Sequence, residues 1–473
     1  MYFMLTIERQ PSIGEKTAVN IPTSDRLHAG AGRAMITPPQ DCILDGFAAR
    51  DHGAEGIHDD LTATALALSR DGRTIVMLGL DLLELTDAQI DTIWRRAEES
   101  YGLMPDELFI NCSHTHAGPL TRSRFNRKFC PPGEWCHPDE KYISCALDGI
   151  HSAIGDAIAN LVPARASFGV GETHIGICRR AHDTSVYKGP AAGYIGIYAN
   201  IPNPHKEINR SCPVLSIMDE AEKTICLLFG APCHPTTMSH PNYLVSAEYP
   251  GAARRILEKS LDGAPSLFIQ GIGGDVKPKI VAEDNGFRSG TYEDVDKVGA
   301  ELANDVLITM NTLLEPIDIH PRTSLNRIPL PFAEGWTEKT FSRYAVEEQS
   351  EFRRNWANYW LDKTGRGETI PTSMDLTLSI MELAPNMRFL GIAGELLTDI
   401  GLKIKHHFNS GLTLPCGYTN GRIGYIPDSN VLREGGYEAT ETVFFTMGMP
   451  APWRDDIDHT LLRAFDNLNR TMR

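Results

Sequence analysis

The feature that most constrains this chain is a repeated pattern in which an apolar, strand-like run ends in a turn of polar and small residues. The runs are residues 108–110, 225–229 and 268–270. The turns that follow them carry His114 and His116, then His234, then Asp275 with Lys277. Because α/β enzymes place their chemistry in the loops that follow strand ends, the pattern predicts an α/β fold with a site at those ends.

The first of these turns holds two histidines with a strand-like spacing. His114 and His116 are two residues apart, and residues i and i+2 of a strand point to the same face. Two imidazoles on one face suit a metal ion or a polarised water, although two surface histidines would give the same pattern. His234, at the end of another apolar run and before a proline that favours extended backbone, supports the site.

The composition is that of an ordinary globular enzyme, with 42% hydrophobic and 22% charged residues. A net charge of −16 excludes nucleic acid and an anionic membrane as main partners, because both attract basic surfaces. No apolar run approaches the roughly 20 residues that span a bilayer, and the N-terminus lacks a basic leader with an apolar core. We expect a cytoplasmic protein that acts on a small molecule, with homo-oligomerisation left open.

Ten cysteines are scattered along the chain without a Cys-x-x-Cys pair. Cys112, Cys226 and Cys233 lie in or beside apolar runs, which indicates buried free thiols in a reducing compartment. Cys130 and Cys136 flank a Pro-Gly loop, so a bridge or a metal site is the alternative there.

Local patterns predict the order of strands and helices in the first part of the chain. Residues 61–69 and 74–80 read as strands joined by an Asp-Gly turn. Thr86 opens a capping box for a helix, and the strand before His114 follows it. The apolar face of this helix consists of Ile90, Ile93, Trp94 and Ala97. This order predicts an α/β fold, a mixed-sheet core flanked by helices.

A change in pattern near Pro316 suggests a division of the chain. We expect an N-terminal arm over residues 1–26, a metal-site domain over 27–315 and a smaller C-terminal α+β portion over 316–473 that completes the site. Further helices are expected at residues 249–259, 292–313 and 338–362, and further strands at residues 376–383 and 387–392.

Several motifs, taken together and in order, resemble those of the neutral/alkaline non-lysosomal ceramidase family. They are residues 113–119, 234–236, 246–251, 270–278, 392–395, 420–427 and 436–439. No single motif is specific, but the collinear set spans residues 29–439. The resemblance implies a ceramidase-like catalytic domain and a zinc-dependent hydrolase, an amidase acting on a C–N or related acyl bond.

The resemblance also implies a set of zinc ligands, namely His114, His234, Glu395 and Tyr425. Two neutral imidazoles and one carboxylate leave Zn²⁺ a net positive charge and room for a water, whose pKa falls from 15.7 to about 7. From the residues alone, Tyr425 equally fits a packed aromatic and Glu395 an acid at a helix N-terminus. Such ligands also accept manganese, iron or nickel.

Five further side chains are candidates for work beside the metal. We expect His116 to shuttle protons or to orient a neighbour. Asp275 and Asp81 could each hold a histidine in one tautomer, or could cap turns instead. Arg179 and Arg180 follow a strand-like run and could bind a substrate carboxylate, or could form a solvated pair.

Lys277 marks a departure from the family. Its ceramidases carry a serine in a Gly-Asp-Val-Ser-Pro segment that is needed for amide hydrolysis, and Lys277 stands in that place. A lysine could neutralise an oxyanion or bind an acidic substrate, but it does not supply the hydroxyl. The family's ceramidases are also longer and secreted, with an immunoglobulin-like domain that this sequence does not show. We therefore expect a polar amide or ester as substrate rather than ceramide.

Two other functions are compatible with the same residues. A metal-dependent lyase or phosphoester hydrolase would use Lys277 and the two arginines for an anionic substrate. A non-catalytic relative that binds metal or ligand would have lost hydrolysis together with the serine.

Overall fold

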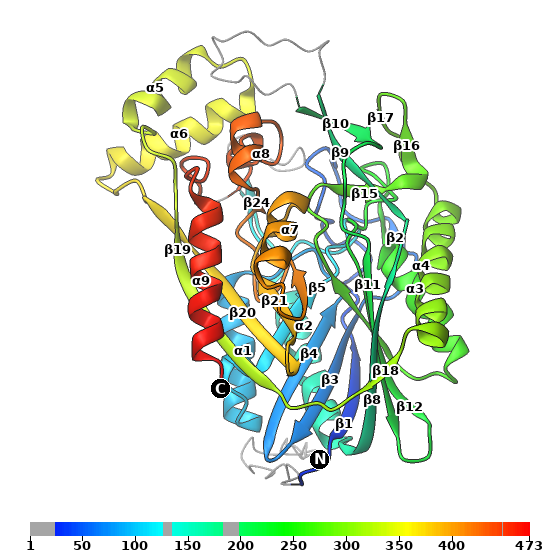
Figure 1. Cartoon of the computed structure of the whole chain (residues 1–473). Coiled ribbons are helices and arrows are strands. Elements are labelled where there is room, and N and C mark those ends of the chain that lie inside the picture. The colour runs from blue at the N-terminus through cyan, green and yellow to red at the C-terminus, as the bar shows by residue number, and fades with distance from the viewer. Residues whose placement is uncertain (1–23, 126–134, 183–197, 447) are drawn as a thin grey trace, which may run out of the picture.

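The computed structural model describes residues 24–125, 135–182, 198–446 and 448–473 (Figure 1). The expected N-terminal arm lies almost entirely outside these residues. The described part is a mixed α/β fold in which helices cover β-sheets, as the sequence predicts. None of the described helices is both long and apolar enough to cross a membrane.

The largest sheet is mixed and has nine described strands. Its order is β14-β12-β11-β8-β1-β3-β4-β5, with β18 paired to β8. The strands are β1 (His28–Met35), β3 (Thr62–Arg70), β4 (Arg73–Leu80), β5 (Leu108–Cys112), β8 (Val162–Glu172), β11 (Ser211–Asp219), β12 (Thr224–Ala231), β14 (Ser266–Gln270) and β18 (Glu315–Ile317). Because β14 also contacts β3, β4 and β5, the sheet folds over on itself.

A second sheet has the order β19-β20-β21-β23, formed by β19 (Arg322–Pro331), β20 (Ser373–Ala384), β21 (Met387–Ile392) and β23 (Leu412–Cys416). It shares one apolar core with the inner faces of the large sheet, where Phe389 makes edge contacts with Phe109 and Phe168. This shared core packs the second sheet, which comes late in the chain, against the first strands of the large sheet.

Helices cover the outer faces of both sheets. They are α1 (Asp87–Tyr101), α2 (Glu140–Ala159), α3 (Glu248–Ser260), α4 (Tyr292–Thr312), α5 (Glu338–Glu347), α6 (Glu351–Gly365), α7 (Thr398–His407), α8 (Ser429–Glu434) and α9 (Ile457–Thr471). The helices α1 and α2 pack on β1, β3 and β4, while α3 and α4 pack on β11, β12 and β14. Figure 1 shows α7 and α9 in front of the second sheet.

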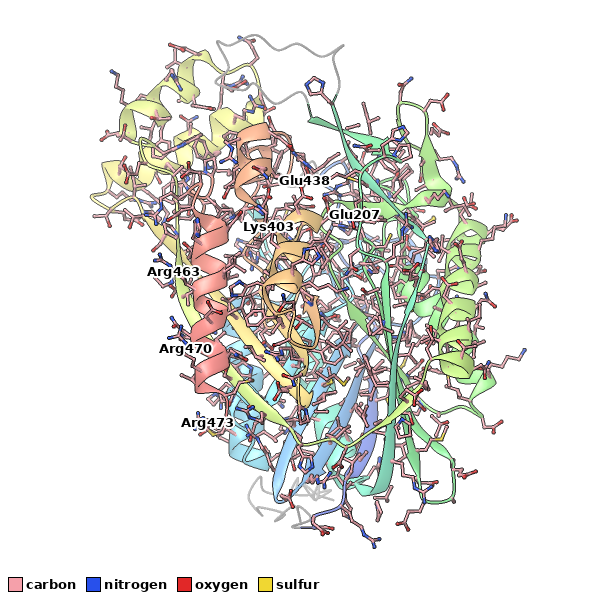
Figure 2. All side chains as sticks on the ribbon, viewed as in Figure 1. Glu207, Lys403, Glu438, Arg463, Arg470 and Arg473 are labelled. Atoms are coloured by element: carbon pink, nitrogen blue, oxygen red, sulfur yellow. The ribbon has the colours of Figure 1, made fainter. Side chains whose placement is uncertain are left out.

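The last helix shows how the amphipathic pattern sets this packing. In α9, Leu461, Phe465 and Leu468 are buried against the second sheet. Arg463 and Arg470 project outward from the same helix (Figure 2). Their spacing places the apolar and charged residues on opposite faces, as expected for a helix that covers a sheet.

Most predicted elements are present, with one difference. The capping box of Thr86 is present, and β4, α1 and β5 form the expected strand–helix–strand unit with β4 parallel to β5. The single helix expected at residues 338–362 is instead the pair α5 and α6, because Glu348 is in extended backbone and ends α5. At the expected boundary, β18 pairs with β8 of the large sheet.

The cysteines differ in part from the expectation of free thiols. Free thiols are found at Cys42, Cys112, Cys145, Cys178, Cys212, Cys226, Cys233 and Cys416. Cys136 is disulfide-bonded, which agrees with the bridge given as the alternative at this loop rather than with a free thiol. Cys130, the other cysteine of the loop, lies outside the described residues.

Candidate metal centre

The candidate ligands come from loops at the ends of strands in both sheets. His114 follows β5, His234 follows β12, and Glu395 begins β22 (Glu395–Leu396) directly after β21. Tyr425 begins β24 (Tyr425–Ile426), which pairs in parallel with β22 so that Tyr425 lies opposite Glu395. Four separate segments therefore supply the side chains of one site.

Asn111, the second-last residue of β5, holds the ends of three strands together. Its side-chain amide donates to the carbonyls of Gly417 at 2.9 Å and Gln270 at 3.3 Å, and its oxygen accepts from the Gln270 backbone N–H at 2.8 Å. The ends of β5, β14 and β23 meet at this buried side chain. A buried, fully paired amide of this kind fixes the relative position of the loops that follow.

His114 reaches the site through an unusual backbone conformation. His114 has φ = +66°, a left-handed conformation that turns the chain out of the strand direction. Such a conformation costs about 1–3 kcal/mol in a residue other than glycine and is concentrated at functional sites. The His114 and His116 rings are 4.9 Å apart at an interplanar angle of 79°, so they meet through this kink rather than as i and i+2 of a strand.

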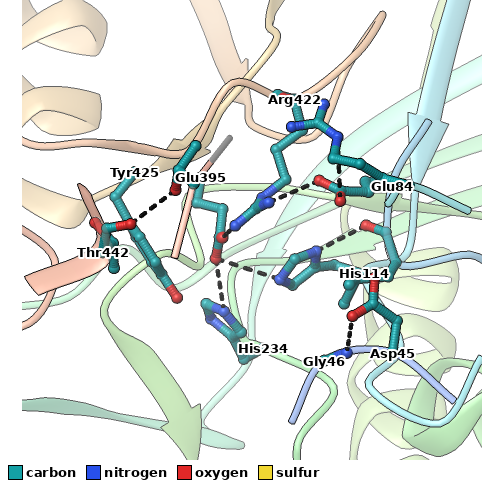
Figure 3. Close-up of polar contacts among 12 residues, drawn as sticks. Asp45, Gly46, Glu84, His114, His234, Glu395, Arg422, Tyr425 and Thr442 are labelled. Carbon is teal, nitrogen blue, oxygen red and sulfur yellow. Dashed lines mark hydrogen bonds and ion pairs between the residues drawn. The ribbon is translucent and has the colours of Figure 1, made fainter. Parts of the chain in front are cut away.

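Backbone carbonyls orient the two candidate imidazole ligands. Nδ1 of His114 contacts the Leu83 carbonyl at 2.8 Å, and Nδ1 of His234 contacts the Gly273 carbonyl. Because a carbonyl oxygen only accepts, each Nδ1 must carry the proton, which leaves a lone pair on Nε2 of the neutral ring. The Nε2 atoms lie 3.2 Å (His114) and 3.1 Å (His234) from Oε2 of Glu395 (Figure 3).

The electrostatic surroundings keep these groups in the forms that bind metals. Burial, reinforced by Arg179, lowers the pKa of His234 to about 4, so the ring is neutral at pH 7. Burial alone would raise the pKa of Glu395, but the neighbouring Arg422 guanidinium holds that pKa well below its usual range. The centre therefore presents a neutral imidazole at His234 and an ionised carboxylate at Glu395.

The donor set fits a metal cation. Two Nε2 lone pairs and a carboxylate oxygen converge with no proton between them, which is repulsive unless a positive charge sits among them. Imidazole nitrogen with carboxylate oxygen is a common donor set for zinc and other transition metals. His114, His116 and His234 offer nitrogen atoms that all lie within 4.8 Å of one another. These three histidines can bind a metal ion.

His116 differs from the other two histidines in its hydrogen bonding. Neither of its ring nitrogens has a hydrogen-bond partner among the described residues, although both are shielded from solvent. Burial and the neighbouring His114 and His234 lower its pKa well below the ordinary value. His116 is thus a neutral imidazole with an unused lone pair beside the two candidate ligands.

Tyr425 lies at the same centre and is held by an arginine. Its hydroxyl accepts a hydrogen bond from Nη2 of Arg179 at 2.9 Å, and its ring lies 6.5 Å from that of His234. Burial raises its pKa well above the usual value, an effect that Arg179 opposes. The hydroxyl points towards the space beside Glu395 and His234 (Figure 3).

The two arginines expected to bind substrate are both buried in an ion-pair cluster. Arg179 Nε donates to Glu438 at 2.8 Å, and Arg180 Nη1 donates to the other oxygen of Glu438 at 2.6 Å. Arg180 also contacts Glu434 at 3.1 Å. The cluster connects β9 (Gly176–His182) to the end of α8 and the residues that follow it. Through Arg179 it also holds the Tyr425 hydroxyl.

The acids expected to orient histidines contact other groups. Asp275 accepts from the backbone N–H and hydroxyl of Thr398, at 2.9 and 2.7 Å, at the start of α7. Asp81 forms two hydrogen bonds with Arg254, at 2.9 and 2.7 Å. The histidine tautomers are set by carbonyl groups instead, which no side-chain pattern in the sequence could reveal.

Lys277 lies on β15 (Val276–Pro278) and is buried. Its Nζ is 4.7 Å from the centre of the Phe287 ring. Burial, together with the positive charge of Arg179, lowers its pKa to about 8. Lys277 is therefore still mainly protonated at pH 7. Keeping this charge buried lowers the free energy of unfolding.

Replacing Lys277 by methionine is expected to raise the free energy of unfolding at pH 7 by about 1–3 kcal/mol. The fall in pKa from 10.5 to about 8 corresponds to about 3 kcal/mol, offset by the lost contact with Phe287. The unfolded chain binds more protons than the folded one between these pKa values, so wild-type stability rises with pH across that window. Urea unfolding of both proteins should show that the difference in their free energies of unfolding is smaller at pH 10 than at pH 7. A difference that does not change with pH would contradict the lowered pKa of Lys277.

A buried charge network that the sequence analysis missed surrounds Glu395. Arg422 donates to Glu395 through Nε at 2.8 Å and also through Nη2, and through Nη1 to Glu84 at 2.7 Å. Glu84 also pairs with Arg124 and, at 3.6 Å, with Arg122. Arg422 lies in one of the motifs that pointed to the family, between the candidate ligands Glu395 and Tyr425, and that position was the available signal.

The described residues around the centre line a cavity of about 230 Å³. Its walls include the candidate ligands His114, Glu395 and Tyr425 together with His116. The remaining walls include the charged residues Asp45, Arg124 and Arg422 and the aromatic residues Tyr437 and Phe445. Arg179, Arg180, Asp275 and Lys277 do not line this described cavity. A small ligand in the cavity would therefore meet charged groups close to the metal ligands.

Fold and site together define an α/β protein with a buried histidine–carboxylate centre. Residues 27–292 match the profile of the N-terminal domain of the neutral/alkaline non-lysosomal ceramidases, and the chain belongs to this family. It is 26% identical over 280 residues to a neutral ceramidase of Mycobacterium tuberculosis and 25% identical over 259 residues to one of Pseudomonas aeruginosa. These alignments cover 54% and 53% of this chain but only 40% and 37% of the relatives.

A solved structure supports the fold over most of the chain. The crystal structure of neutral ceramidase from Pseudomonas aeruginosa superposes with a TM-score of 0.67, covering 94% of this chain and 74% of that one at 17% identity. A ceramidase complexed with C2 gives the same TM-score. Because the match covers 94% of the chain, it extends beyond residues 27–292 into the part that forms the second sheet.

Proposed function

We propose that this protein is a zinc-dependent hydrolase of a carbon–nitrogen amide bond in a small polar substrate. The observation that carries the proposal is the convergence of two Nε2 lone pairs on one carboxylate oxygen. Membership of the ceramidase family, whose named relatives are ceramidases, supports amide hydrolysis. A charged cavity of about 230 Å³, below the roughly 300–1,000 Å³ of drug-sized sites, supports a small substrate.

His114, His234 and Glu395 would hold the zinc ion, with Tyr425 as a fourth ligand. When bound, zinc lowers the pKa of a water to about 7 and polarises a carbonyl. Arg422 neutralises the carboxylate of Glu395 from the side away from the histidines, so that only one carboxylate oxygen faces the metal position. Arg179 orients the Tyr425 hydroxyl.

His116 is the residue that we assign to proton transfer. Its free lone pair lies in the same cavity, where it can take a proton from the attacking water and return it to the leaving amine. We assign Asp275 and Lys277 supporting roles behind the candidate ligands, outside the lining of the described cavity. Asp275 fixes the start of α7 beside Glu395, and Lys277 adds positive charge near Arg179.

The test is turnover by metal-free and metal-loaded protein. Protein stripped with a chelator and reloaded with one equivalent of zinc should release amine from short N-acyl amides, and the stripped protein should not. Ceramide with chains of different length serves as the comparison substrate. Turnover of ceramide alone would overturn the polar substrate, and zinc binding with no turnover of any amide would indicate a non-catalytic relative.

A further inference from the structure

Arg124 lines the metal-site cavity and has one hydrogen-bonding edge, at Nη1, that none of the described residues uses. Its Nε donates to both oxygens of Asp45, at 3.1 and 3.0 Å, and its Nη2 donates to Asp45 at 2.8 Å and to Glu84. Its Nη1 group donates to none of the described residues. Two of the five N–H groups of this guanidinium are therefore left for another acceptor.

The position of Arg124 allows a ligand to reach that edge. Arg124 lines the same cavity as His114 and Glu395, and its side chain keeps 13% of its surface exposed. Asp45 and Glu84 hold the guanidinium from one side, and both are buried. An arginine fixed in this way loses little conformational freedom when it binds a ligand.

Arg422, the other arginine in the cavity wall, lacks such an edge. All three of its nitrogens donate to carboxylates, Nε and Nη2 to Glu395 and Nη1 to Glu84. Among the described residues, the two remaining N–H groups of Arg422 therefore lie on different nitrogens, whereas those of Arg124 both lie on Nη1 and can bind one anion together. The comparison separates the two residues by function although they share Glu84.

The charge balance favours an anionic ligand once a metal is bound. Around the cavity, the carboxylates Asp45, Glu84 and Glu395 are matched by three arginines, Arg122, Arg124 and Arg422. A divalent cation adds two positive charges to this balanced set. A buried site with excess positive charge attracts anions.

We infer that Arg124 is a specificity-determining residue that binds a carboxylate of the substrate, so that the preferred substrates are small amides bearing a carboxylate near the scissile bond. The inference rests on the proposed function. A carboxylate that accepts both N–H groups of Nη1 forms a charge-assisted contact, stronger than a hydrogen bond to a neutral group.

The experiment compares N-acetylglycine with N-acetylglycinamide on the zinc-loaded protein, using release of acetate as the readout. Wild-type kcat/KM should favour the carboxylate by about tenfold or more, and Arg124→Met should reduce that preference to about threefold or less. Arg124→Lys keeps a charge beside Asp45 and Glu84 but lacks the fork, so it should fold and still lose most of the preference. Arg95→Met is the control, because Arg95 is exposed, pairs with the exposed Glu99 and takes no part in the charge network of the cavity; it should leave the preference intact.

Direct binding of both compounds by calorimetry distinguishes the possible failures. Turnover of both compounds without a preference for the carboxylate, or a preference that survives in both Arg124 variants, overturns the inference and leaves the hydrolase. Selective binding of N-acetylglycine that is lost in Arg124→Lys, without turnover of any amide, supports the anion site and overturns the proposed function. The absence of both turnover and selective binding overturns both.

Discussion

Replacement of His234 by alanine is expected to abolish stoichiometric zinc binding and to lower amide kcat/KM by about 10³-fold or more. His234 is fully buried, supplies one of the two Nε2 lone pairs at Glu395, and has its Nδ1 committed to the Gly273 carbonyl. Its loss leaves three of the four proposed ligands, with His114 as the only imidazole among them, and removes one of the two imidazoles that face the Glu395 carboxylate. The several kcal/mol that a metal contributes to charge stabilisation would go with it.

Metal analysis and steady-state kinetics on the same preparations check this expectation. His174→Ala is the control, since His174 is exposed and contacts only the surface residues Arg210, at 2.9 Å, and Glu172, at 3.8 Å, among the described residues. The control should retain about one zinc per chain and normal activity. A His234→Ala protein that keeps its metal would show that the centre is assembled from other residues.

The strand ends that define the site could be predicted from sequence because apolar runs and polar turns follow local rules. His114 and His234 both lie at such ends, as expected. Glu395 and Tyr425 have no comparable local signal, and only the family resemblance suggested them. The parallel pairing of β22 with β24 brings these two together, and pairing between distant segments is not encoded in any local pattern.

The supporting interactions were harder to predict than the candidate ligands. Each histidine is oriented by a carbonyl group, and every residue carries a carbonyl, so sequence cannot single out Leu83 or Gly273. The left-handed backbone at His114 was also unexpected, because such a conformation is disfavoured for a non-glycine residue and is imposed by its surroundings. The sequence thus indicates which residue types are present, whereas tertiary contacts set their orientation.

The division between α5 and α6 shows the same limit in the fold. The charged stretch contains no proline or glycine between residues 338 and 362, so periodicity favours one helix. In the structure, Arg353 pairs with Glu348 at 3.0 Å and with Glu441 at 2.6 Å, across the break between the helices. Tertiary ion pairs with a distant segment accompany a break that helix propensity alone does not predict.

Replacement of Glu84 by alanine is expected to lower the free energy of unfolding by about 3–5 kcal/mol, the range for removal of one member of a buried charge cluster. Glu84 is buried and lies against three arginines, Arg122, Arg124 and Arg422. These arginines hold its pKa well below the usual value, so the carboxylate is charged in the folded protein. Without it, three guanidiniums would remain with too few carboxylates.

The effect should reach the metal centre as well, because Arg422 contacts both Glu84 and Glu395. Released from Glu84, Arg422 can shift relative to Glu395, so zinc affinity should fall by about 10–100-fold, as for other residues that support a ligand. Urea unfolding and zinc titration measure the two effects separately. Glu99→Ala is the matched control, because the Glu99–Arg95 pair is 60% exposed on both sides and contributes under about 1 kcal/mol. If Glu84→Ala and Glu99→Ala lost the same unfolding free energy and the same zinc affinity, the buried network would not stabilise the centre.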